Sequence, residues 1–86
     1  MDVRKILEDN DLSNVIILDG YDPAFVVVTH DGRAVYDYDT MVAWLRDTHD
    51  FTEEEAIEWI EYNTIRALPY MGGGAPIILL RLGEEE

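Results

Sequence analysis

The segment Ala24–Tyr36 contains a valine-rich run and a second short apolar run on either side of the dipeptide Asp31-Gly32. Valine and tyrosine favour extended backbone, whereas Asp-Gly is typical of the tight turn of a β-hairpin. We therefore predict strands at Ala24–Thr29 and Ala34–Tyr36, joined by a two-residue loop with a type I′ turn. This hairpin establishes that a β-sheet forms part of the expected fold.

A helix is predicted directly after the hairpin. Asp37 or Asp39 can cap its N-terminus, because a carboxylate accepts hydrogen bonds from the free backbone N–H groups there. The helix should end near Thr48. Apolar residues spaced for one buried helical face follow the cap; they are Tyr38, Met41, Val42 and Leu45.

A second helix is predicted to begin at a capping box. Thr52 and Glu55 have the spacing at which each side chain can bond to the other residue's backbone N–H, and hydrophobic Phe51 precedes them. Pro69 forces the helix to end at or before Leu68. The residues expected to be buried are Ala56, Ile57, Ile60 and Thr64.

Three shorter elements complete the prediction. Asp2 can cap a short helix at 2–9, and the apolar runs Val15–Leu18 and Ile77–Leu82 read as buried strands. The expected class is α+β, with the order α-β-β-β-α-α-β and a small sheet of about four strands that carries helices on one face. We expect Val15–Leu18 and Ile77–Leu80 to be central strands and the hairpin to lie toward an edge.

Two C-terminal segments have little expected regular structure. Gly72–Gly74 reads as a flexible connection, and Glu84–Glu86 as a solvated acidic tail. The length of 86 residues allows one compact domain, residues 1–86.

The charge balance restricts the function. The chain has 19 Asp and Glu against 6 Lys and Arg, a net charge of −13, and yet 48% of its residues are hydrophobic. We therefore expect a core surrounded by carboxylates, which repels nucleic acid and anionic membranes and attracts basic protein surfaces. The absence of cysteine excludes disulfides and thiolate nucleophiles. Because no apolar run is long enough to span a bilayer, the expected location is the cytoplasm.

The clearest candidate site is an acidic stretch in and before the second predicted helix. Carboxylates that lie along one side of a helix repel one another by a few tenths of a kcal/mol per pair, so a helix would ordinarily include lysines among them. In the functional interpretation, this row of carboxylates would imitate a phosphate backbone and occupy the nucleic-acid groove of another protein. The alternative is a solubilising face. These residues are Asp47, Asp50, Glu53, Glu54, Glu58 and Glu61.

A second candidate cluster follows on the same helix. Trp59, Tyr62 and Arg66 belong to the residue types that most often anchor protein interfaces. Trp59 has the alternative of packing against the neighbouring helix that carries Trp44. Asn63 lies near the buried stripe, where its amide must find hydrogen-bond partners.

Other motifs predict no catalytic residue, metal or cofactor. Asp9–Asp11 and Asp37–Asp39 are better explained as caps and turns, since the sequence after Asp9 lacks the EF-hand glycine and glutamate. His30-Asp31 and His49-Asp50 lack a third catalytic partner. The three glycines lie between a predicted helix and a strand, the reverse of a phosphate loop. We expect a protein that is not an enzyme.

Two motifs resemble a known group of proteins. The string Ala34–Tyr38, "AVYDY", and the helix Thr52–Tyr70, "TEEEAIEWIEYNTIRALPY", resemble small bacteriophage and prophage proteins of unknown function. The resemblance extends from Ala24 to about Ile78, and the chain departs from the group at Gly72–Gly74 and in its acidic tail. It implies a phage-derived origin and a bacterial cytoplasm, and it brings no catalytic residues or cofactor.

The leading hypothesis is a non-enzymatic inhibitor that binds a basic, nucleic-acid-handling host protein, as DNA mimics directed at CRISPR or restriction machinery do. Such binding should weaken steeply with salt. The alternative is a small structural or dimerising phage protein whose charge serves only solubility. Both hypotheses are compatible with a homodimer.

Overall fold

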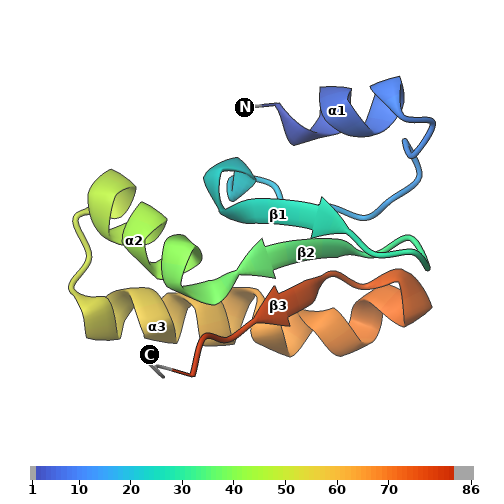
Figure 1. Cartoon of the computed structure of the whole chain (residues 1–86). Helices are drawn as coiled ribbons and strands as arrows, with labels where there is room; N and C mark the ends of the chain where they lie inside the picture. The colour runs from blue at the N-terminus through green and yellow to red at the C-terminus, as the bar shows by residue number, and fades with distance from the viewer. Residues whose placement is uncertain (1, 83–86) are drawn as a thin grey trace.

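The computed structural model describes residues 2–82, which form an α+β fold (Figure 1). The predicted class is confirmed, but the sheet in these described residues has three strands rather than about four. The predicted acidic tail, Glu84–Glu86, lies outside the described residues. The elements in chain order are α1 (Val3–Asp9), the 3₁₀ helix η1 (Asp22–Ala24), β1 (Phe25–Val28), β2 (Ala34–Asp37), α2 (Tyr38–His49), α3 (Glu53–Asn63), the 3₁₀ helix η2 (Ile65–Gly74) and β3 (Ile77–Leu79).

The sheet has the order β1-β2-β3, with β1 antiparallel and β3 parallel to β2. The central strand is therefore β2 of the hairpin, all of whose residues are buried. The prediction that Ile77–Leu80 forms a central strand is wrong, since β3 is an edge strand and Leu79 is exposed. Within the described residues, only β2 has hydrogen-bonded neighbours on both sides, so its backbone is shielded along both edges.

The predicted strand at Val15–Leu18 does not form. Instead of pairing with a strand, the backbone N–H of Leu18 donates to the hydroxyl of Tyr36 at 3.0 Å. Leu18 is buried in the core, and the three residues before it are half-buried. The apolar run is thus explained by burial of an irregular segment, which periodicity cannot distinguish from a buried strand.

The hairpin forms, but its loop differs from the predicted type I′ turn. Thr29 and Arg33 face each other, with the Thr29 N–H donating to the Arg33 carbonyl at 2.8 Å. Asp31 has no positive φ angle and only Gly32 does, at +85°. A type I′ turn needs positive φ at both central residues, so the two-residue loop is ruled out. The Thr29 hydroxyl also bonds to the Asp31 carboxylate and to the Arg33 N–H, which holds the longer turn closed.

The helix starts that were predicted from capping residues are confirmed. Asp2, Asp37 and Thr52 cap α1, α2 and α3 through their side chains. The core lies between α2, α3 and the sheet, and Figure 1 shows α3 and η2 behind β2 and β3. Tyr38 and Ile57 are half-buried, and the remaining predicted inward residues are buried: Met41, Val42, Leu45, Ala56, Ile60 and Thr64.

The C-terminal segment differs from the prediction on both sides of β3. The backbone before β3 is more regular than predicted, and the backbone after it is less regular. α3 ends at Asn63, consistent with the limit that Pro69 imposes, and η2 continues from Ile65 to Gly74 with a non-helical Gly72 at φ +82°. The glycines expected to be a flexible connection thus belong to η2. β3 stops at Leu79 rather than Leu82. Within the described residues, no helix has the length and apolar character needed to cross a membrane.

Candidate functional site

The corner between α2 and α3 positions the predicted acidic residues. Asp50 ends α2 in the left-handed conformation, with φ +58°. At the start of α3, the Thr52 N–H donates to the Glu55 carboxylate at 2.8 Å, and the Glu55 N–H donates to the Thr52 hydroxyl at 3.2 Å. This capping box places Glu53, Glu54 and Glu55 at the positive end of the helix dipole, which stabilises their charges.

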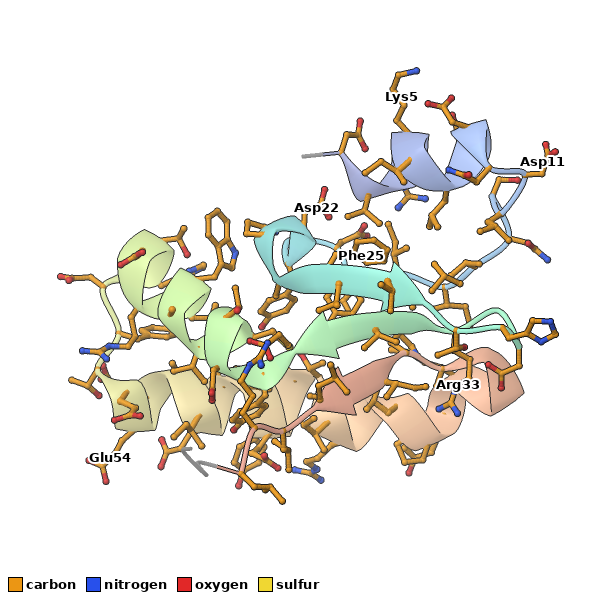
Figure 2. All side chains as sticks on the ribbon, in the orientation of Figure 1. Lys5, Asp11, Asp22, Phe25, Arg33 and Glu54 are labelled. Carbon is orange, nitrogen blue, oxygen red and sulfur yellow. The ribbon has the colours of Figure 1, made fainter. Side chains whose placement is uncertain are left out.

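All six predicted carboxylates are exposed, and together we call them the acidic corner: Asp47, Asp50, Glu53, Glu54, Glu58 and Glu61. The structure distributes them over several neighbouring surfaces. Asp47 and Asp50 line a hollow beside Arg46, whereas Glu53 lies in a second hollow next to Ile57. Figure 2 shows Glu54 pointing away from the body of the molecule.

Glu61 belongs to a different surface from Glu58. It lines a hollow near β3 together with Tyr38 and Leu80. Burial raises the pKa of the Tyr38 hydroxyl, and the nearby Glu61 carboxylate raises it further. Glu61 therefore has a local partner, the Tyr38 hydroxyl.

Within residues 2–82, no carboxylate of the acidic corner forms an ion pair. The ion pairs there are Arg4–Asp19, Lys5–Asp9 and Arg81–Asp37. Arg46 lines the same hollows as Asp47, Asp50 and Glu53 without forming an ion pair with them. The corner therefore has an excess of negative charge that attracts an external cation.

Aromatic rings gather beside the acidic corner. The Trp59 ring centroid lies 5.7 Å from that of Phe51 and 6.2 Å from that of His49. Trp59 thus packs against the last residue of α2, as one of the two sequence interpretations expected, but its side chain remains part of the surface and is 44% exposed. The Arg66 guanidinium lies 5.0 Å from the centroid of the Tyr62 ring, which is also exposed. The three predicted anchors are therefore neighbours.

Phe51, Trp59 and Tyr62 line a shallow hollow that we call the aromatic groove. Its other lining residues are Glu55, Glu58 and Asn63. Sequence reasoning assigned Phe51 and Glu55 only to the helix cap, although the four-residue spacing of Glu55 and Trp59 places them on the same helix side. Asn63 is exposed rather than close to the buried stripe, and its amide donates to the Trp59 carbonyl at 3.1 Å.

Within residues 2–82, no group of three or more His, Asp or Glu side chains is arranged to hold a metal ion. Comparisons of the chain with protein-family models, curated proteins and solved structures found no match. The candidate function therefore rests on the chemistry of the acidic corner and the aromatic groove.

Proposed function

We propose that this protein is a non-enzymatic inhibitor or adaptor that binds a basic surface of a nucleic-acid-handling bacterial protein through its acidic corner. The observation that carries this proposal is the set of exposed carboxylates that form no ion pair within residues 2–82 and lie next to the exposed rings of Trp59 and Tyr62. Carboxylates supply long-range attraction to a basic groove, and Trp59, Tyr62 and Arg66 supply contact area once the partner has docked.

The proposed partner class follows from charge. A groove that accepts a phosphate backbone is lined by Lys and Arg, and a compact domain with a net charge of −13 is complementary to it. CRISPR effectors and restriction enzymes have such grooves. The resemblance to small phage proteins supports this choice and a bacterial cytoplasm as the place of action.

A salt-controlled capture experiment tests the proposal. The tagged protein should recover a nucleic-acid-binding effector from bacterial lysate at low salt and release it at high salt, because screening weakens attraction between exposed charges. Glu58→Lys should abolish recovery. Glu8→Lys makes the same charge change on exposed α1 and should leave recovery intact. A salt-resistant partner, or equal loss in both variants, would show that the acidic corner is not the binding surface.

One observation favours the alternative of a small structural or dimerising protein. The chain around the β3 edge exposes apolar side chains, with Leu80 65% and Leu82 85% exposed. Exposed apolar side chains that are close in the sequence are typical of surfaces where copies of a protein associate. Concentration-dependent dimerisation in sedimentation velocity, abolished by Leu80→Lys, would support the alternative, whereas a monomer at all concentrations would oppose it.

A further inference from the structure

The aromatic groove combines two chemical features that rarely occur together on a surface. Three aromatic side chains, Phe51, Trp59 and Tyr62, line it together with the acidic residues Glu55 and Glu58. Ring faces attract cations through their quadrupole, and carboxylates attract them through their charge. The groove is therefore suited to a cationic side chain with apolar surface rather than to a purely apolar one.

The groove is partly preorganised. One oxygen of Glu55 accepts the Thr52 N–H at 2.8 Å, so this side chain is already held beside Trp59. The Phe51 and His49 rings pack against Trp59 and limit its rotation. A ligand would consequently lose little free energy in ordering these groups.

The molecule already contains one interaction of the required kind. Arg66 lies over the Tyr62 ring, at 5.0 Å from its centroid. The Tyr62 ring therefore already has a cation beside it, whereas Trp59, which is 44% exposed, is the other exposed ring of the groove. Tryptophan is the strongest of the aromatic side chains as a cation acceptor.

We propose that the aromatic groove binds an arginine side chain of a protein partner, with the guanidinium stacked on Trp59 and paired with Glu58. Arginine suits this site better than lysine, because its planar guanidinium stacks on rings and pairs with a carboxylate through two parallel hydrogen bonds. The inference rests on the proposed function and deepens it, since it identifies the contact that would follow attraction to the acidic corner.

Titration of the full chain with a short peptide tests the groove directly. The probe is the blocked tripeptide Gly-Arg-Gly, followed by nitrogen-15 NMR of the two indole N–H signals, with citrulline and lysine versions as comparisons. The Trp59 signal should shift and saturate with the arginine peptide, and the half-buried Trp44, which does not line the groove, serves as an internal control. The citrulline peptide, which has nearly the same shape but no charge, should give no shift. The lysine peptide should bind more weakly.

Two glutamates on α3 provide a matched pair of variants. Glu58→Gln should lower the affinity for the arginine peptide about two- to fivefold, as expected for the loss of one exposed ion pair. Glu54→Gln removes the same charge from the same helix outside the groove, and should change binding by less. Trp59→Leu should also weaken binding about two- to fivefold through loss of the cation–π contact.

The outcomes separate this inference from the proposed function. The arginine site would be overturned by any of three results. These are an unchanged Trp59 signal, equal shifts with the citrulline or lysine peptide, and equal effects of the two glutamate variants on binding. Salt-sensitive capture of an effector would still support the acidic corner in that case. Conversely, a saturable Trp59 shift without any captured effector would support the arginine site and count against the proposed partner class.

Discussion

Asp37 is the residue on which the junction of sheet and helix depends. Its side chain is buried, yet its carboxylate accepts hydrogen bonds from the Thr40 hydroxyl at 2.6 Å and the Thr40 N–H at 3.1 Å. The Arg81 guanidinium adds an ion pair at 2.9 Å. The Thr40 hydroxyl is the main cause of a lowered Asp37 pKa, and Arg81 contributes to it, while burial acts in the opposite direction.

The lowered pKa predicts how stability depends on pH. Because the pKa in the folded state lies below its ordinary value of 3.8, the ionised carboxylate stabilises the fold above that pH, and the contribution is lost as the pH falls through the folded-state pKa. Asp37→Asn should therefore lower the free energy of unfolding by about 1–2 kcal/mol at neutral pH, since a charge-assisted set of bonds is replaced by weaker ones. Denaturant titration at neutral pH and at about pH 2 measures the difference, which should shrink in acid.

A neighbouring aspartate is the control for that prediction. Asp39 is exposed and lies in the first turn of the same helix. Asp39→Asn should change stability by less than about 0.5 kcal/mol, as is usual for surface substitutions. Equal losses in the two variants, or an Asp37→Asn loss that is the same in acid, would contradict the role assigned to the buried carboxylate.

Asp50 offers a second prediction at the scale of one residue. Its φ of +58° lies in the left-handed region, which is disfavoured for residues with a Cβ atom because that atom crowds the backbone. Glycine has no Cβ atom and adopts this conformation without that cost. Asp50→Gly should raise the free energy of unfolding by about 0.5 kcal/mol, after allowance for the greater freedom of glycine in the unfolded chain. Asp50→Asn removes the charge and retains the Cβ. If the asparagine variant is at least as stable as the glycine variant, repulsion between carboxylates rather than backbone strain limits this position.

At the scale of the element, α3 depends on its capping box. Thr52→Ala removes the hydroxyl that accepts the Glu55 N–H and should destabilise the protein by about 0.5–2 kcal/mol. Glu55→Gln retains an oxygen for the Thr52 N–H and should have a smaller effect. Thermal unfolding of both variants followed by circular dichroism makes the comparison, and a neutral Thr52→Ala would mean that tertiary packing alone sets the start of α3.

At the scale of the whole molecule, the excess of negative charge should itself reduce stability. Like charges on a compact domain repel one another, and added salt screens this repulsion. Raising sodium chloride from about 10 mM to about 1 M shortens the screening length from roughly 30 Å to roughly 3 Å, so the melting temperature should rise. Glu54→Lys combined with Glu58→Lys should reduce the salt effect, and a melting temperature independent of salt would show that the carboxylates are spaced widely enough not to interact.

The parts of this protein that could be predicted from sequence are those whose hydrogen bonds close over three or four residues. Asp2 and Thr52 are predictable as caps, and Asp37 as one of two candidates beside Asp39, because each cap bonds to a backbone N–H three positions along the chain. Helical spacing also predicts that Glu55 and Trp59 share a side of α3. It does not bring the α3 carboxylates together, since Glu53, Glu58 and Glu61 line different hollows.

The other parts of the fold were decided by contacts between residues that are far apart in the sequence. Val15–Leu18 is as apolar as a buried strand, but its Leu18 N–H bonds to the Tyr36 hydroxyl, a partner 18 residues away. β2 became central only because β3 returns to pair with it, and Asp37 meets Arg81 across 44 residues. Such contacts depend on chain closure and on competition among several apolar partners, which local propensity and periodicity do not encode.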